Sequence, residues 1–553
     1  MKNLTKFIKI DIKRKSLFIN NIFTSLKYLL LSLTFILSTH VNADIKKLEG
    51  QLPYYTSISA VYKTPGEFDN LKDWFSWLDE NDTNVGVLDK IYDAKFLPHI
   101  VMHNDLIIIG GGGLKNLSPI RFYKSIYLNG ISIDTVHDYW SNKHKYGVAF
   151  WSMAISNDIT VDIKNVTNSF SNKLIRIEND NLKVTVTIKN VTIINNSSGG
   201  IHIRAIVNNA IIEGLSVTEP IGYEYAMLEA SDVNQKNAGN AYIDQRTVYN
   251  DTTLVRYYSS GLTIGSKVNY SENIQVKNCH FENIIIGKDA TSFQNGGNTS
   301  RHTTALMIAG NNCKITNTTF KNCERSFYLR GNNFTVDGIT VENNKYVAGY
   351  MYIHKGQRHN GITKITNSEF KGKTKIIALH SSTDSTVIKN VKFEITPTNI
   401  TYKLDDDFIT RQVYKGFLNE GIFREKGGNF TFEDVKTEIK ANENNLNFTY
   451  LIGLTGSGNN SLFFNNVNYI GTEPKYFLAA NKFKKIELNN VGIFGKTISI
   501  NNTKKLNIKN IYPALKGCDT YLFNIYYITN VDMFTFNNEI IEVIPGVLNR
   551  IRL

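Results

Sequence analysis

The stretch Val336-Asp337-Gly338-Ile339 repeats in outline at Ile315-Thr316-Asn317-Thr318 and at Ile365-Thr366-Asn367-Ser368. In each copy, an apolar and a polar residue lead into a single Asn or Gly, and a second short strand-like run follows. The same register recurs at Gly130, Asn165, Asn190, Gly214, Asn278, Asn317, Gly338, Asn367, Asn390, Asp434, Asn466, Asn490 and Asn510. We call these residues the turn column.

Every member of the turn column is Asn, Gly or Asp, the residues that enter the left-handed backbone region at low cost. Most steps between members are 20 to 35 residues, a spacing typical of solenoids. A tight bend with positive φ, repeated once per coil, requires this composition. The chain is therefore predicted to be all-β, a right-handed parallel β-helix of about 13 coils, with the column at the turn between the second and third strands.

The ends of the chain differ from this pattern. Basic residues followed by an apolar run over 28–37 and the small residues Val41-Asn42-Ala43 predict a signal peptide over 1–43. The alternative left open is that this segment is kept as an uncleaved membrane anchor; no stable membrane span is expected if it is cleaved. The region 44–104 is expected to cap the solenoid with a helix within Glu67–Glu80, where Phe68, Leu71, Phe75 and Leu78 have helical spacing. The β-helix is predicted over 105–514 and a C-terminal cap over 515–553.

Three steps in the column are long, and each fits one coil with extra residues after its third strand. The expected insertions are 221–260, 285–303 and 397–420. Insertions gathered on one side of a repeat protein often build a binding site. Three residues past the column lie Phe281, Phe320, Val341, Phe370 and Phe393, which are expected to form an internal stack. Of the four cysteines, Cys279, Cys313 and Cys323 fall on consecutive coils. Two of them could therefore form a disulfide, and the alternative is that they are buried as small apolar residues.

The first strands align by register as Ala305–Ala309, Ser326–Arg330, Tyr350–His354 and Ile376–His380. Alternate residues of a strand face opposite sides, and neighbouring strands lie about 4.8 Å apart. This alignment places Arg330, His354 and His380 in one outward column, with Tyr328 and Tyr352 in a second column beside it. The following turn adds Lys355, Arg358 and His359, and earlier coils add Arg176, Glu178, His202 and Arg204.

An outward group of Arg, His and Tyr favours chemistry on an acidic sugar. An Arg neutralises a carboxylate through a bidentate fork, and a His or Tyr abstracts or returns a proton. These are the parts required to cleave a uronate polymer by β-elimination. We expect Arg330 to neutralise the carboxylate and His354 or Tyr352 to act as base. His380, Tyr328 and Lys355 are expected to be acid or subsite residues, and Arg358, His359, Arg204 and Arg176 to bind substrate.

Two other functions remain open. Glycoside hydrolysis needs two acids on either side of one bond, and the candidates are Glu178, Glu229, Asp232 and the run Asp405-Asp406-Asp407. The Asp run is also the one candidate for a calcium ion, although no metal site is predicted. A non-catalytic adhesin or carbohydrate-binding protein is the second alternative, because stacked polar residues also occur on solvated solenoid faces.

The asparagine-rich column, the three short strands per coil and the insertions after the third strand resemble the pectate-lyase-like superfamily of right-handed parallel β-helices. The resemblance covers about 105–513 and implies the fold, with activities that vary among members. Tyr328-Leu329-Arg330-Gly331-Asn332 is similar to the Leu-Arg-His-Gly-Asn stretch of lyases of the chondroitinase B and alginate lyase type, which implies a catalytic role for Arg330. The family's Lys one coil earlier is replaced here by Ala309.

The sequence thus predicts a secreted protein (periplasmic, cell-surface or extracellular), monomeric or trimeric, whose partner is an acidic polysaccharide. The formal net charge of +13 is compatible with such a polymer. Neither a nucleotide cofactor nor a nucleic-acid partner is expected. The glycine run Gly110–Gly113 lacks the Lys-Ser/Thr of a phosphate loop, and the basic residues are spread along the chain.

Overall fold

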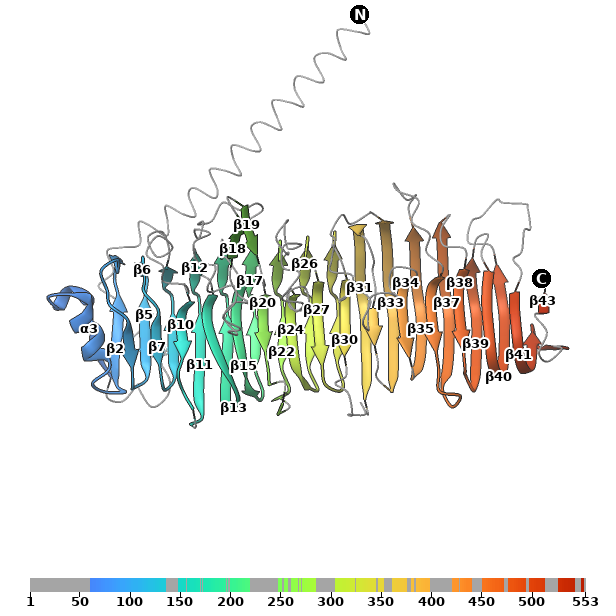
Figure 1. Cartoon of the computed structure of the whole chain (residues 1–553), viewed down its shortest axis with the longest axis horizontal. Helices are drawn as coiled ribbons and strands as arrows, with labels where there is room; N and C mark the ends of the chain where they lie inside the picture. Colours follow the sequence, from blue (N-terminus) through green and yellow to red (C-terminus); the bar gives the residue numbers. More distant parts are fainter. Residues whose placement is uncertain are drawn as a thin grey trace, which may run out of the picture.

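The protein is all-β and its strands stack side by side along one axis (Figure 1). The computed structural model describes residues 60–135, 148–155, 157–169, 171, 173–194, 196, 199–218, 247–250, 253–256, 260–266, 268–269, 271–284, 304–323, 325–344, 347–352, 361–374, 379–381, 384–397, 420–426, 428–439, 450–471, 476–493, 497–512, 526–542 and 549–551. Almost all strand pairs are parallel, and each pair joins one coil to the next, which is consistent with the predicted parallel β-helix.

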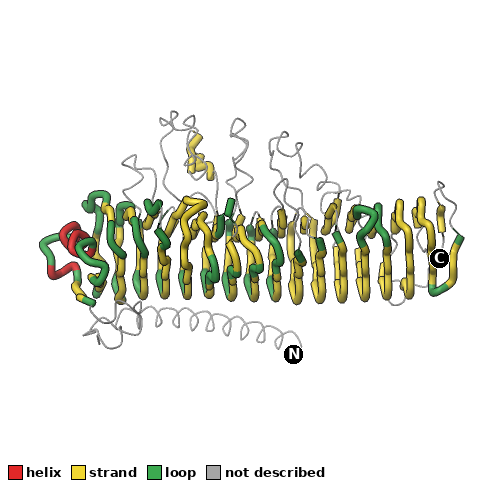
Figure 2. The backbone as a smooth tube through the Cα atoms, turned by 90° about the horizontal axis from the view of Figure 1, so that it is seen from below, coloured by secondary structure: helices red, strands yellow, loops and turns green. Residues whose placement is uncertain are grey.

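Three parallel ladders run along the stack, one for each strand of a coil (Figure 2). The ladder of first strands, here called the first-strand face, contains β4(Ile100–Met102), β7(Ile120–Phe122), β10(Val148–Ser152), the first part of β13(Lys173–Lys189), β15(Gly199–Val207), β20(Ser260–Ile264), β24(Thr304–Asn311), β27(Arg325–Arg330), β30(Val347–Tyr352), β32(Leu379–Ser381), β34(Glu420–Lys426), β36(Tyr450–Thr455), β38(Tyr476–Asn481), the first part of β40(Thr497–Tyr512) and β41(Tyr526–Phe536).

The second and third strands form the other two ladders. Second strands are β1(Val61–Lys63), β2(Asn84–Leu88), β5(Leu106–Gly110), β8(Ile126–Asn129), β11(Ile159–Lys164), the later part of β13, β16(Ile211–Glu213), β22(Gln275–Lys277), β25(Lys314–Thr316) and β28(Thr335–Asp337). Third strands are β3(Ile91–Asp93), β6(Gly113–Lys115), β9(Ser132–Asp134), β12(Thr167–Ser169), β14(Thr192–Ile194), β17(Ser216–Thr218), β23(His280–Glu282), β26(Thr319–Lys321) and β29(Thr340–Glu342). Further along, second and third strands are continuous in β31(Ile362–Thr374), β33(Ser385–Pro397), β35(Asn429–Ile439), β37(Ser461–Gly471), β39(Lys485–Ile493) and β40. The short β21(Ser271–Glu272) pairs with the end of β24.

The turn column is confirmed at every predicted position, because each member has a positive φ, from 47° at Asn317 to 72° at Gly130. Its side chains also bond to one another along the stack. Asn190 Nδ2 donates to Asn165 Oδ1 at 3.2 Å, and Asn390 Nδ2 donates to Asn367 Oδ1 at 2.7 Å. Asparagine therefore has two roles at this corner. It adopts the left-handed backbone conformation, and its side chain forms a hydrogen bond with the neighbouring coil.

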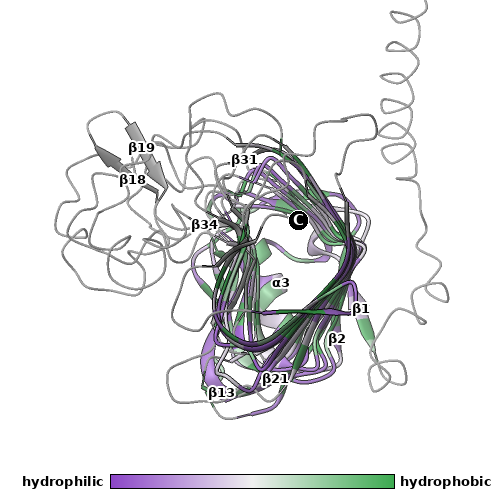
Figure 3. Ribbon diagram, turned by 90° about the vertical axis from the view of Figure 1, so that its right-hand side faces the viewer, coloured by the Kyte–Doolittle hydropathy of each residue, from purple (hydrophilic) through white to green (hydrophobic). Residues whose placement is uncertain are grey.

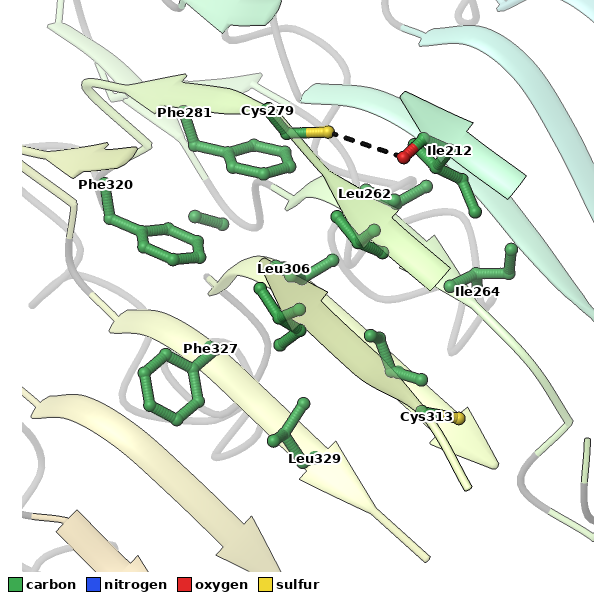
Figure 4. Packing of buried hydrophobic residues seen from close by; sticks show 14 of the residues in the cluster. Ile212, Leu262, Ile264, Cys279, Phe281, Leu306, Cys313, Phe320, Phe327 and Leu329 are labelled. Atoms are coloured by element: carbon green, nitrogen blue, oxygen red, sulfur yellow. Dashed lines mark hydrogen bonds between the residues drawn. The ribbon is translucent and has the colours of Figure 1, made fainter. Parts of the chain in front are cut away.

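The interior is filled by one apolar cluster that continues from coil to coil. Figure 3 looks along the stack and shows hydrophilic and hydrophobic residues interspersed along its strands. The predicted internal stack is confirmed, since Phe281, Phe320, Val341, Phe370 and Phe393 are all buried and successive members pair in the third ladder. The Phe281 and Phe320 rings stack with centroids 5.5 Å apart (Figure 4). Each coil thus buries its core against its neighbours.

The three described cysteines are free and buried, and each follows a positive-φ Asn at a different corner of its coil. Cys279 follows the second strand, Cys313 follows the first strand and Cys323 follows the third strand. The alternative of a disulfide among these three is therefore wrong, because residues at different corners are kept apart by the core. Figure 4 shows Cys279 packed in the core, with its Sγ 3.9 Å from the Ile212 carbonyl oxygen.

The predicted N-terminal capping helix is present as α3(Leu71–Leu78), preceded by the single turn η1(Pro65–Glu67). Asn70 caps α3 by accepting a hydrogen bond from Asp73 N at 3.0 Å. Trp74, Phe75 and Leu78 are buried and cover the open end of the core. Parallel pairing already begins between β1 and β2, inside the region predicted as cap.

Beyond residue 514, β41 still pairs in parallel with β40. The stack then closes with β42(Glu539–Ile541) and β43(Asn549–Ile551), which both pair antiparallel to β41. An antiparallel strand protects an edge that would otherwise be open to another chain.

The strands that flank the predicted insertions confirm which corner these insertions leave. The first insertion lies between β17, a third strand, and β20, which belongs to the first-strand face. The second lies between β23 and β24, and the third between β33 and β34, again from a third strand to a first strand. Most of 221–260 and 397–420, and all of 285–303, lie outside the described residues, apart from the antiparallel hairpin β18(Thr247–Asn250) and β19(Thr253–Arg256). No helix among the residues that the structure describes is long and apolar enough to span a membrane.

Candidate functional site

The outward side of the first-strand face carries two neighbouring columns of residues. The central column runs through Val101, Arg121, Trp151, Arg176, His202, Thr263, Met307, Tyr328, Tyr350, His380 and Arg424. Two residues further along the strands lies the flanking column, which includes Glu178 beside Arg204 and, further along, Ala309, Arg330 and Tyr352. These two columns contain most of the described residues that were predicted to be functional.

The predicted alignment of Arg330 with His354 and His380 is wrong by two residues. Arg330 pairs with Tyr352, and His380 pairs with Tyr350 in the central column. A shift of two residues leaves every side chain on its original face, because strand side chains alternate with a period of two. The hydrophobic pattern therefore could not detect the error.

Arg330 ends β27, and the chain turns sharply after it. Gly331 has a φ of 138°, and a Cβ at that position would collide with the carbonyl oxygen of Gly310 on the neighbouring coil. The Arg330 side chain is half-buried, and its buried Nε has no hydrogen-bond partner among the described residues. Tyr328, also half-buried, lies on the same side of the same strand. A buried donor without a partner is costly, so this guanidinium is suited to an acidic ligand.

Several candidate residues cannot be placed at this site. His354, Lys355, Arg358 and His359 lie outside the described residues. Tyr352 and His380 are placed by their strands alone, at the register positions given above.

A second group of functional candidates lies on β13 and β15, and it is tightly packed. The Arg176 side chain is fully buried, donates from Nη2 to Glu178 Oε2 at 2.6 Å and lies 5.2 Å from the centroid of the Trp151 ring. His202 Nε2 lies 3.3 Å from Glu178 Oε1. The sequence predicted these residues on one face but did not predict that they would bind one another.

The pKa shifts in this group follow from its burial and its charges. Burial by itself raises the pKa of Glu178, but the contacts with His202 and Arg176 outweigh it and hold that pKa well below its usual range. Burial lowers the pKa of His202 to about 4, although the Glu178 contact acts in the opposite direction. At neutral pH the group therefore contains an ion pair between Arg176 and Glu178 beside a neutral imidazole.

Arg204, predicted to bind substrate, is bound by Asp180 through both its Nε and its Nη2. Asp180 also accepts a hydrogen bond from Ser266 Oγ at 3.0 Å. These two hydrogen bonds to Asp180 Oδ2 give Arg204 a structural role in fixing β13 where its register with β15 shifts, between Glu178 and Lys183. Sequence spacing could not reveal this role, because a register shift interrupts the strand period of two.

Sequence reasoning missed Arg121 and Trp151, the two members of the central column that precede Arg176. Arg121 stands between two buried apolar residues, in Ile120-Arg121-Phe122, and Trp151 follows the buried run Val148-Ala149-Phe150. The signal that could have found them is a polar or aromatic residue beside buried apolar positions, aligned backward from Arg176.

Among the described residues, no group of His, Cys, Asp and Glu side chains is arranged to hold a metal ion. Comparison with known proteins found no matching family model, no matching curated protein and no matching solved structure. The fold and the two columns therefore define an all-β protein of stacked parallel strands, and its function has to be argued from its own residues.

Proposed function

We propose that this chain is an exported, right-handed parallel β-helix of about 13 coils, of the pectate-lyase-like superfamily, that binds an acidic polysaccharide and cleaves it by β-elimination. The observation that carries the proposal is the pairing of Arg330 with Tyr352 on neighbouring strands of the first-strand face. The buried Nε of Arg330 has no hydrogen-bond partner among the described residues, and the neighbouring strand places Tyr352, a residue type that can transfer a proton, beside it in the ladder.

The reaction needs three groups around one uronate residue. Arg330 binds the carboxylate, which makes the hydrogen on the adjacent carbon more acidic. Tyr352, acting as the phenolate, removes that proton and becomes the neutral phenol, the released electron pair forms a carbon–carbon double bond, and the glycosidic carbon–oxygen bond breaks. An acid then protonates the leaving oxygen, and Tyr328 and His380 are the candidates. The observed register favours Tyr352 over His354 as the base, because Tyr352 is the ladder neighbour of Arg330.

Hydrolysis is less well supported by the described residues. A general acid must hold a proton at the working pH, whereas Glu178 is ion-paired with Arg176 and its pKa is held low. The other acids considered, Glu229, Asp232 and Asp405-Asp406-Asp407, lie outside the described residues, so a hydrolase mechanism would depend on them alone.

Binding without cleavage is the second candidate, and one observation favours it. Thr263, Met307 and Ala309 point outward from the first-strand face but are buried. The described part of the face between Arg176 and Arg330 therefore offers a ligand little exposed surface, which favours binding at its ends over a continuous catalytic groove.

The test is a panel of uronate and neutral polysaccharides incubated with the wild type, Arg330→Ala, Arg330→Lys and Tyr352→Phe. Lys314→Gln, an exposed cation on the second ladder, is the matched control. The wild type is expected to release unsaturated products that absorb ultraviolet light, and the Arg330→Ala and Tyr352→Phe variants to lose about a hundredfold or more in rate. Arg330→Lys keeps the charge but loses the fork, so it is expected to fall in between.

Each remaining outcome selects a different function. New reducing ends without ultraviolet absorbance indicate hydrolysis. Binding without either product indicates a carbohydrate-binding protein. Cleavage that is unchanged in Arg330→Ala contradicts the proposed mechanism. Export is tested separately, since N-terminal sequencing of the exported protein is expected to begin at Asp44.

A further inference from the structure

The N-terminal part of the first-strand face carries a second exposed group of a cation and aromatic rings. Arg121 on β7 is exposed, and its Cζ lies 6.0 Å from the centroid of the Trp151 ring on β10. Tyr123 lies two residues beyond Arg121, on the same side of the chain, and is 36% exposed. Its ring stacks on His103 with centroids 5.4 Å apart. This group repeats the combination of Arg and Tyr found near Arg330.

Arg121 differs from the other cations around it. Nearby Lys124 is paired with Asp82 at 3.0 Å, and Arg176 is paired with Glu178 at 2.6 Å. No acidic partner of Arg121 occurs among the described residues, and its ordering comes from the face of Trp151 instead. A cation–aromatic contact holds the guanidinium in place without using its hydrogen bonds. The fork therefore stays available for an anionic ligand.

Trp151 is itself held in position from the other side. The buried guanidinium of Arg176 lies 5.2 Å from the ring centroid, so the indole is placed between two arginines of the central column. The ion pair with Glu178 holds the Arg176 guanidinium in this position. Arg121 is thus the exposed member of a stack in which Trp151 and Arg176 are already held by contacts with one another, and this preorganisation reduces the entropy lost when Arg121 binds a ligand.

The separation from Arg330 determines what kind of ligand could use both sites. Arg121 and Tyr328 belong to the same column and are six strand-to-strand steps apart, from β7 through β10, β13, β15, β20 and β24 to β27. At about 4.8 Å per step, this is roughly 29 Å. Figure 1 shows these strands in one continuous stack. A single sugar cannot reach both groups, whereas an extended polymer along the axis can.

We infer that Arg121, Trp151 and Tyr123 form a distal subsite for an acidic sugar unit of a long polysaccharide chain whose cleavage point lies at Arg330. The Arg121 fork binds the carboxylate or sulfate of that unit, and the exposed Tyr123 ring supports its apolar face. The inference rests on the proposed function for the identity of the chain, but the subsite itself requires only an acidic polymer.

The experiment compares long uronate oligosaccharides with short ones that cannot span the two groups, using neutral oligosaccharides as a further control. Binding is measured in the Tyr352→Phe background, which keeps Arg330 but lacks the proposed base, by calorimetry and by tryptophan fluorescence, with Trp151→Phe to identify the signal from Trp151 among the four tryptophans. Arg121→Gln is the test variant and Lys314→Gln, which removes one exposed charge from another ladder, is the matched control. Circular dichroism confirms that each variant is folded.

Arg121→Gln is expected to weaken binding of long uronate chains about tenfold and to leave the binding of short chains unchanged. Lys314→Gln is expected to change binding less than about twofold. Equal affinity in Arg121→Gln and the parent overturns the inference, as does an equal loss for long and short chains. If long chains bind through Arg121 but the wild type never cleaves them, the subsite stands and the lyase proposal fails. If no acidic chain binds the parent protein, both fail.

Discussion

The buried His202 makes the stability of the first-strand face depend on pH, and the size of the effect follows from its surroundings. The perturbation is a shift from pH 7 to pH 5, applied to the wild type and to His202→Gln. Burial lowers the pKa of His202 from an ordinary value of 6.5 to about 4 in the folded protein. Between those two values, the unfolded chain binds a proton that the folded protein excludes.

The sign and magnitude follow from proton linkage. Stability is lost as pH falls through 6.5, and the loss is complete below the folded pKa of about 4. For a single group with these two pKa values, the free energy of unfolding decreases by about 2 kcal/mol between pH 7 and pH 5. Glu178 contributes below this window, because its pKa is lowered from 4.5 and its stabilisation is lost only as pH falls further.

Urea unfolding followed by circular dichroism at pH 7, 6 and 5 measures this decrease. His202→Gln removes the titrating group, so its free energy of unfolding is expected to fall by about 2 kcal/mol less than that of the wild type over the same range. His103→Gln is the control, since the His103 side chain is 69% exposed. An acid-induced loss that is the same in His202→Gln and the wild type would refute the argument that His202 is neutral and buried.

Three further predictions concern the corners, the thiols and the cap. Asn190→Ala is expected to lower the free energy of unfolding by about 1–2 kcal/mol, because Ala resists the left-handed backbone. Asn190→Gly keeps the turn and loses only the hydrogen bond to Asn165. Urea unfolding is therefore expected to give a lower midpoint for Asn190→Ala than for Asn190→Gly. Burial raises the pKa of Cys279 to about 11 and of Cys313 to about 12. Both thiols are therefore expected to resist alkylation at pH 8 in the native protein and to react in the urea-unfolded chain. Mass spectrometry that finds both cysteines labelled in the native state contradicts this. Trp74→Ala is expected to cost about 3–5 kcal/mol and to raise hydrogen exchange in β2 first, whereas a uniform rise along the whole chain would argue against a local cap.

The repeat could be predicted from sequence because its physical cause is local. A corner with positive φ accepts few residue types, so Asn165, Asn317 and Gly338 mark their turns without any knowledge of distant contacts. The internal stack followed directly, since Phe320 lies a fixed number of residues after its corner. The turn column also located the corner from which the insertions leave.

The candidate site was harder to predict because it depends on register and on contacts between coils. The period of two in strand patterns cannot exclude a slip of two residues, and the alignment of His354 with Arg330 contained that slip. The pairing of Arg204 with Asp180 depends on the register shift within β13, which carries no periodic signal. Arg121 and Trp151 were missed because their significance arises only when neighbouring strands bring them together.

The most direct test of the central claim is a crystal structure of Tyr352→Phe soaked with a long uronate oligosaccharide. The account predicts a sugar carboxylate within hydrogen-bonding distance of the Arg330 guanidinium, with the chain extended along the first-strand face. An oligosaccharide bound on another ladder, or bound on this face with its carboxylates turned away from Arg330, would contradict it.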